Sequence, residues 1–262
     1  MLTFAKTFHT KRVLIPYFTF GDPSISFTEE LVREAVQAGA DIIELGMPFS
    51  DPIADGPVIQ ASHQRALTTK PAISFEDLFQ SIAILKITCQ VPFVVMTDVN
   101  LVLQFGISQF FEQASKSGLD GVILPNVPIE EMSPYLAYAK QYNVAVIQLV
   151  SYHCSDERLK KIVDSSEGFL YVISSMGTTG IRQTLSDQLP AFVEKIRKLR
   201  DIPVAIGFGV STPQQGRDIW AYAQGVIVGS VLVQIMAQQY LPQKAIEEVC
   251  LKIKTFKQGM LV

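Results

Sequence analysis

The chain has 262 residues, of which 48% are apolar and 18% are charged, and its net charge is −3. This composition excludes a disordered chain, which combines low hydrophobicity with high net charge. Three cysteines are too few for a small disulfide-stapled scaffold. With 22 basic against 25 acidic residues, the chain has no basic bias that would indicate a nucleic-acid-binding protein. Its length fits one large domain or two small ones.

The cysteines and the apolar stretches bear on where the protein works. Cys89, Cys154 and Cys250 are far apart and odd in number, which is typical of reduced cysteines in the cytosol. Residues 1–11 have no apolar core of signal-peptide length. The most apolar stretches, such as residues 225–237, fall short of the roughly 18 residues that a membrane span requires. We therefore expect a soluble, cytoplasmic protein.

Short apolar runs alternate with longer helical patterns along the chain. Residues 1–9 are expected to form an N-terminal helix. Eight strands are then predicted, at residues 13–18, 41–45, 92–97, 121–124, 144–150, 168–173, 203–207 and 225–228. Several of these runs are nearly all apolar, as in strands that are covered on both faces.

Between the predicted strands, apolar residues recur at helical spacing. Three such faces are Phe27, Leu31, Ala35 and Ala38; Leu78, Ile82 and Leu85; and Phe192, Ile196 and Leu199. Ser74 and Ser155 are predicted to cap the N-termini of two helices, since acidic residues follow each of them in the first turn.

Regular alternation of strand and helix predicts a parallel sheet. Eight strand-plus-helix units use nearly the whole chain, so we expect an α/β fold, a single (β/α)8 TIM barrel over residues 1–262. The extra N-terminal helix would cap the bottom of this barrel. An open doubly wound sheet is the alternative, but no G-x-G-x-x-G follows the first strand, which ends in Gly21-Asp22-Pro23 instead.

In such a barrel the active site lies at the C-terminal ends of the strands. Glu44 stands between Ile43 and Leu45 in an otherwise apolar strand, and strand alternation sends it to the opposite face from both. If its neighbours face the helices, Glu44 points into the barrel mouth, where desolvation would raise its pKa toward a useful acid/base range. The other interpretation is a charge that is satisfied by a structural partner.

Two further carboxylates follow Glu44 in the next loop. Asp51 and Asp55 lie in a stretch that contains prolines and glycines, where an aspartate most often forms a turn. Taken together with Glu44, they offer a candidate pair of catalytic carboxylates, because an acid and a base must flank one substrate.

Three glycine-containing segments indicate phosphate binding. They are residues 177–180, 207–211 and 229–230, each directly after a predicted strand. Glycine lets backbone N–H groups approach an anion, and a helix N-terminus adds its dipole. Ordinary turns are the alternative, but two successive segments after the last two strands favour a phosphorylated substrate. His9, His63 and His153 are scattered, so no metal site is expected.

Residues 43–56, IELGMPFSDPIADG, resemble the signature of the tryptophan synthase alpha chain family. Residues 16–23, 171–180, 207–209 and 226–230 resemble other segments of that family, so the resemblance covers essentially the whole chain. It implies a carbon–carbon lyase of tryptophan biosynthesis. The implied reaction is retro-aldol cleavage of indole-3-glycerol phosphate to indole and glyceraldehyde 3-phosphate, with no cofactor and no metal in this chain.

The resemblance also implies individual roles. Glu44 would protonate the indole ring at C3 and assist proton movement at the glycerol hydroxyl, and Asp55 would interact with the indole N–H. The implied substrate-binding residues are Tyr17, Ile59, Met96, Ile123, Leu149, Tyr171 and Thr179. The implied phosphate-binding residues are Gly180, Gly209, Gly229 and Ser230.

A partner chain is implied as well. The family works as an α₂β₂ heterotetramer in which indole passes to the pyridoxal phosphate site of the beta chain, so that cofactor belongs to the partner. Pro48 and Asp51 would lie at the interface. The chain departs from the family at Ser175, Asn126 and Asp98, where an arginine, an aspartate and an aromatic residue are usual.

Two other functions stay open at this point. One is an alpha chain of weak or no activity that mainly activates its beta chain. The other is a different phosphate-binding barrel enzyme such as an isomerase. The second is disfavoured, because its acid/base pair would not require the whole motif from Glu44 to Asp55.

Overall fold

The computed structural model describes residues 2–10, 12–52, 55–68, 72–174, 186–207, 209–239 and 241–259. Thr179, Gly180 and Ser175 lie outside the described residues.

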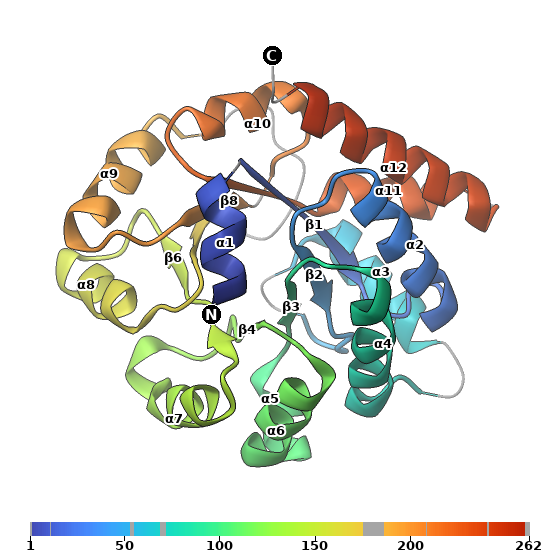
Figure 1. The fold of residues 1–262 in the computed structure, drawn as a ribbon, viewed down its shortest axis with the longest axis horizontal. Helices are drawn as coiled ribbons and strands as arrows, with labels where there is room; N and C mark the ends of the chain where they lie inside the picture. The colour runs from blue at the N-terminus through green and yellow to red at the C-terminus, as the bar shows by residue number, and fades with distance from the viewer. Residues whose placement is uncertain are drawn as a thin grey trace.

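One parallel sheet forms the centre of the molecule (Figure 1). The described residues contain nine strands: β1 (Val13–Thr19), β2 (Ile43–Gly46), β3 (Phe93–Met96), β4 (Gly121–Ile123), β5 (Ala145–Val146), β6 (Leu149–Ser151), β7 (Leu170–Ile173), β8 (Val204–Gly207) and β9 (Gly225–Val228). Their spatial order is β5-β4-β3-β2-β1-β9-β8-β7-β6. Each lies within the span of a strand that the sequence predicts, apart from one or two terminal residues.

The fifth predicted strand is divided in two. β5 pairs with β4, whereas β6 pairs with β7, and only Ile147 and Gln148 separate β5 from β6. The Ile147 N–H donates to the carbonyl of Val122 at 2.9 Å, and the Tyr171 N–H donates to the carbonyl of Gln148 at 3.0 Å. The chain itself therefore joins the two ends of the sheet, and the result is the TIM barrel that the strand count predicts rather than an open doubly wound sheet.

Helices surround the barrel on its outside, apart from the first helix, which lies over one end of it (Figure 1). In the described part of the chain they are α1 (Leu2–Thr10), α2 (Ile25–Gln37), α3 (Pro57–Leu67), α4 (Phe75–Thr88), α5 (Val99–Phe105), α6 (Ile107–Ser117), η1 (Ile129–Glu131), α7 (Ser133–Tyr142), α8 (Asp156–Ser165), α9 (Leu189–Leu199), α10 (Pro213–Trp220), α11 (Ser230–Gln238) and α12 (Pro242–Gly259). No helix among these described residues is long and apolar enough to cross a bilayer.

The predicted helix signals are present with one exception. Ser74 caps α4 in a capping box with Asp77, and Ser155 caps α8 by accepting from the Arg158 N–H. The apolar faces of α2 and α4 are buried as expected. Leu199 differs, because it ends α9 and is 40% exposed, so the buried face of that helix stops at Ile196.

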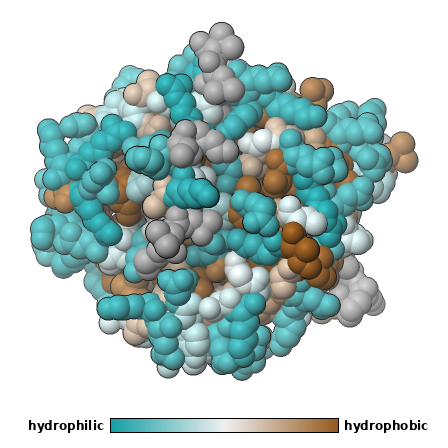
Figure 2. Space-filling model, viewed as in Figure 1, coloured by the Kyte–Doolittle hydropathy of each residue, from teal (hydrophilic) through white to brown (hydrophobic). Residues whose placement is uncertain are grey.

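The barrel interior holds its own cluster of apolar side chains, and α1 covers one end of it (Figure 1). Phe4 and Phe8 of α1 pack on Phe169, with ring centroids 5.8 and 5.4 Å apart. These rings close the bottom of the barrel, at the N-terminal ends of the strands. Hydrophilic residues cover most of the outer surface on this face (Figure 2).

Replacing Phe4 by alanine tests this closure. Phe4 is fully buried, so Phe4→Ala leaves a cavity and is expected to lower the free energy of unfolding by about 3–5 kcal/mol. Urea unfolding followed by circular dichroism measures the loss. Leu251→Ala is the control, because Leu251 is 65% exposed and its truncation is expected to stay within about 0.5 kcal/mol. Equal unfolding midpoints for the two variants would contradict the closure.

Candidate active site

Glu44 is buried at the open end of the barrel. Its neighbours Ile43 and Leu45 pack into the apolar layer between the sheet and the helices, so Glu44 faces the opposite way and is 1% exposed. Its Oε2 atom has no hydrogen-bond partner among the described residues. Burial, with a smaller contribution from the negative charge of Asp55, raises the pKa of Glu44 to about 8. At neutral pH this carboxyl therefore holds a proton that it can donate.

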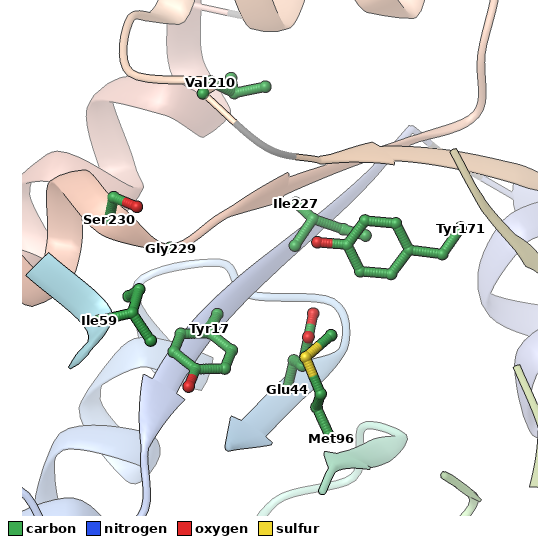
Figure 3. A pocket seen from close by; sticks show the side chains of 10 residues that line it. Tyr17, Glu44, Ile59, Met96, Tyr171, Val210, Ile227, Gly229 and Ser230 are labelled. Carbon is green, nitrogen blue, oxygen red and sulfur yellow. The ribbon is translucent and has the colours of Figure 1, made fainter. Parts of the chain in front are cut away.

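A hollow of about 430 Å³, including its open mouth, contains Glu44 (Figure 3). It is lined by Tyr17, Glu44, Ile59, Met96, Tyr171, Gly209, Val210, Ile227, Gly229 and Ser230. Eight of these are candidate site residues from the sequence. The sequence did not single out Val210 and Ile227, although both follow from position: Val210 comes directly after Gly209, and strand alternation turns Ile227 inward.

Two tyrosines flank Glu44 (Figure 3), and each depends on a glycine in a neighbouring strand. A Cβ atom on Gly46 would lie 2.0 Å from the Tyr17 hydroxyl, and one on Gly207 would lie 2.4 Å from the Tyr171 hydroxyl. Both rings therefore lie directly against backbone. Burial raises the pKa of both tyrosines well above the usual value, so both hydroxyls stay protonated.

The other side of the hollow is made of backbone. Gly209 follows β8 with a φ of +90°, and Gly229 precedes α11, which begins at Ser230. The first N–H groups of a helix have no partners within it, and the helix dipole adds positive potential there. No side chain caps α11. An anionic group of a ligand can therefore accept from these N–H groups.

Asp55 lies in a second hollow that adjoins the first. This hollow measures about 770 Å³ with its open mouth, and Tyr17 and Met96 line both hollows. The Asp55 side chain is 14% exposed. Burial raises the pKa of Asp55 to about 7. Two carboxyls with raised pKa values thus stand at one end of the barrel, and the charge of Asp55 adds to the raised pKa of Glu44.

His63 of α3 lies beside Asp55, although the sequence analysis set it aside as one of three scattered histidines. Its Nε2 atom is 3.6 Å from Asp55 Oδ2 and 3.3 Å from the Tyr17 hydroxyl. Helical spacing could have found it: His63 is four residues after Ile59, so the two share a face of a helix that begins at Pro57.

The remaining candidates are more dispersed. Ile123 and Leu149 belong to the cluster of interior side chains that includes Met96 and Tyr171, and they do not line the hollow that holds Glu44. Pro48 is buried in the loop after β2. Asp51 is exposed in the same loop and accepts from the Ser50 hydroxyl at 2.7 Å.

Two departures from the family pattern contact each other at the rim of the second hollow. The Asn126 amide donates to Asp98 at 2.9 Å, and the Val99 N–H donates to the Asn126 carbonyl oxygen at 3.0 Å. Asp98 also caps α5 by accepting from the Asn100 N–H. These contacts join the ends of β3 and β4.

A proton donor and a second carboxylate therefore stand next to backbone that can hold an anion, which is the arrangement of a barrel enzyme that performs acid/base chemistry on a phosphorylated substrate. In the described part of the chain, no three side chains of the types that ligate metals come together.

Comparison with known proteins identifies the family within this class. The family model described as "Tryptophan synthase alpha chain" matches residues 4–261. The chain is 38% identical over 248 residues to the tryptophan synthase alpha chain of Bacillus thuringiensis, covering 95% of this chain and 93% of that one. It is 39% identical over 236 residues to that of Petrotoga mobilis, covering 90% and 91%. The chain belongs to the tryptophan synthase alpha chain family.

Solved structures agree. A chain of Mycobacterium tuberculosis tryptophan synthase superimposes with a TM-score of 0.90 at 30% identity, covering 99% of this chain and 98% of that one. The alpha chain from Legionella pneumophila gives 0.87 at 29% identity, covering 98% and 97%. The family is a lyase of tryptophan biosynthesis that cleaves indole-3-glycerol phosphate.

The buried carboxyl of Glu44 makes stability depend on pH. Its pKa is about 8 in the folded chain against 4.5 for an unperturbed glutamate, so between these values the folded state holds a proton that the unfolded state has released. Stability attributable to this group is therefore present at low pH and is lost as pH rises through 8. Glu44→Gln removes this dependence. Its advantage over the parent is expected to grow by about 1–3 kcal/mol from pH 5 to pH 8.5. Urea unfolding at both pH values measures it, and an advantage that is equal at both would refute the assignment.

Gly207→Ala tests the support of Tyr171. The added methyl group would overlap the ring, which must shift from its present position. We expect a loss of stability of about 1–3 kcal/mol and a larger proportional loss of catalytic efficiency. The same change in a Tyr171→Ala background separates the causes, because that background lacks both the hydroxyl and the ring atoms that the methyl group would meet. An equal loss of stability in the two backgrounds would contradict the steric explanation.

Proposed function

We propose that this chain cleaves indole-3-glycerol phosphate with Glu44 as the acid/base and Asp55 as the carboxylate that faces the indole N–H. The observation that carries this assignment is the pair of desolvated carboxyls, with pKa values raised to about 8 and about 7, at the open end of the barrel. The resemblance of residues 43–56 to the family signature supports the same two roles.

In the proposed reaction the neutral Glu44 carboxyl donates its proton to C3 of the indole ring. The ring becomes an indolenine with positive charge at its nitrogen, and the negative charge of Asp55 stabilises it. The Glu44 carboxylate then accepts the proton of the adjacent glycerol hydroxyl. The C–C bond breaks, its electron pair returns to the ring, and indole and glyceraldehyde 3-phosphate are released. At the end of the reaction Glu44 is protonated again, as it was at the start.

The rest of the hollow is proposed to hold the two ends of the substrate. The backbone around Gly209, Gly229 and Ser230 would bind the phosphate, and Gly180 is proposed to join it there. Tyr17, Ile59, Met96 and Tyr171 would contact the indole ring, with Ile123 and Leu149 supporting it from the barrel interior. Thr179 is also proposed to contact substrate. Backbone N–H groups and a helix dipole can hold a phosphate without a basic patch, in keeping with a net charge of −3.

A beta chain is the proposed partner, in an α₂β₂ assembly that we expect to be cytoplasmic. Solved structures of tryptophan synthase among the structural relatives support a beta chain as partner. The loop that contains Pro48 and Asp51 borders the second hollow through Phe49 and Pro52, so it could form both the interface and the route for indole. Pyridoxal phosphate would belong to the partner, and the whole chain would act as a single domain over residues 1–262.

Conservative changes at the two carboxylates test the proposed function. Glu44→Gln removes the transferable proton and is expected to lower kcat for indole release by about 10²–10⁴-fold. Asp55→Asn removes the charge that stabilises the indolenine and is expected to lower kcat by about 10²–10³-fold. Indole release from indole-3-glycerol phosphate, measured with and without added beta chain, gives both values. Glu157→Gln is the control, because Glu157 lies on α8 with its side chain 82% exposed. No turnover by the parent chain in either condition would sink the proposal.

A further inference from the structure

The helix that carries His63 is fixed to the first strand of the barrel. Arg65 donates two hydrogen bonds to Asp22, at 2.8 and 2.7 Å, and the hydroxyls of Ser62 and Thr19 lie 2.6 Å apart. These contacts hold the second turn of α3 in one position against β1 and the loop after it. The His63 side chain, buried between them, therefore has a defined orientation.

The contacts of His63 determine which ring nitrogen accepts a hydrogen bond and which one donates. The Phe49 N–H donates to Nδ1 at 3.0 Å, so Nδ1 is an acceptor and carries no proton. Burial lowers the pKa of His63 to about 4, which keeps the ring neutral at physiological pH. In a neutral imidazole the proton must then lie on Nε2. His63 thus presents an N–H donor on the side away from Phe49.

Hydrogen bonding beyond His63 runs in one direction. The Ser62 hydroxyl donates to the Ile59 carbonyl at 2.6 Å, so it accepts from Thr19. Thr19 can then accept from the Tyr17 hydroxyl at 3.4 Å, and Tyr17 from His63 Nε2 at 3.3 Å. Each proton in this chain is directed away from His63.

Asp55 is the second acceptor in front of the His63 donor. Its Oδ2 atom lies 3.6 Å from Nε2, longer than a hydrogen bond but within reach of one after a small movement. Catalytic hydrogen bonds are often long in the absence of substrate and shorten when it binds. Among the described residues, the titratable side chains in contact with His63 Nε2 are Asp55 and Tyr17. The negative charges of Glu44 and Asp22 lie near Tyr17 and raise the pKa of its hydroxyl.

We propose that His63 is a positioning residue for the cleavage reaction: held by the Phe49 N–H, its neutral ring directs an N–H toward Asp55 and favours the charged form of that carboxylate. This inference rests on the proposed function, in which Asp55 must be charged while Glu44 keeps its proton. Of the two buried carboxyls, Asp55 lies 3.6 Å from this donor and Glu44 has no partner for its Oε2 atom among the described residues, so the donor favours charge on Asp55.

The same ring links the loop after β2 to the reaction. Phe49 belongs to that loop, together with Pro48 and Asp51. A displacement of the loop that breaks the Phe49 contact frees Nδ1 and lets the ring turn away from Asp55. Any partner that holds this loop in place would thus also hold Asp55 in its charged state.

Two amide substitutions test the roles of the two His63 nitrogens one at a time. The Asn side chain of His63→Asn reaches the position of Nδ1, so it can accept from Phe49 but places no donor at the position of Nε2, which faces Asp55. The longer side chain of His63→Gln reaches the position of Nε2 and can donate to Asp55. We expect His63→Asn to raise the Asp55 titration midpoint by about 0.5–1 pH unit, as followed by ¹³C NMR of the side-chain carboxyl, and His63→Gln to leave it near the parent value.

Activity gives the second measurement. For indole release, His63→Asn should lower kcat/KM by about tenfold, mainly through kcat, and move the acidic limb of the pH profile upward. His63→Gln should recover most of this loss. His9→Asn on the exposed side of α1 is the matched control. Circular dichroism confirms that each variant is folded.

The outcomes are distinct. Equal Asp55 midpoints and equal pH profiles in the Asn and Gln variants would overturn the role of His63. A parent chain that releases no indole would overturn the proposed function instead, and the NMR titration would still decide whether His63 controls the charge of Asp55.

Discussion

A closed parallel barrel covers both faces of every strand, and the chemistry of this protein depends on that constraint. Any side chain that points inward is removed from water, whether it is apolar or charged. Glu44 is such a side chain, and the absence of a hydrogen-bond partner for Oε2 among the described residues leaves its carboxylate form unstabilised. The raised pKa that makes it a proton donor at neutral pH and the loss of stability as pH rises toward 8 are therefore the same physical effect.

The narrow interior also explains why backbone and side chains approach so closely. Phe4 and Phe8 fill the bottom of the barrel, and the hollow that holds Glu44 lies at the other end. There, Gly46 and Gly207 let the rings of Tyr17 and Tyr171 lie directly on neighbouring strands. Side chains at these two positions would displace both tyrosines, which line the hollow around Glu44. The lack of side chains at Gly46 and Gly207 therefore shapes the hollow as much as the side chains that line it.

Much of this arrangement could be predicted from the sequence, and the failures have physical causes. Apolar runs gave the strands, because burial on both faces leaves no polar alternation. The same runs could not show that the fifth predicted strand divides at Ile147, since the apolar pattern does not say which strand each residue hydrogen-bonds to. Leu199 fitted the helical spacing but lies where the helix has already left the core. Glu44 and Asp55 could each be identified as candidates from their own place in the sequence. The role of His63 depends on a hydrogen bond from the backbone N–H of Phe49, which no pattern of side chains in the sequence indicates.

Asp98 and Asn126 show why departures from a family pattern are better judged in pairs. Taken separately, a charge in place of an aromatic residue and an amide in place of a carboxylate both look disruptive. In the fold they lie on adjoining strand ends, and the amide N–H of Asn126 needs an acceptor that the carboxylate of Asp98 supplies. An aspartate at position 126 would instead bring two negative charges together beside the second hollow, and its carboxylate would have no N–H to donate. The amide of Asn126 therefore suits a carboxylate at position 98, because it donates a hydrogen bond where a second carboxylate would repel.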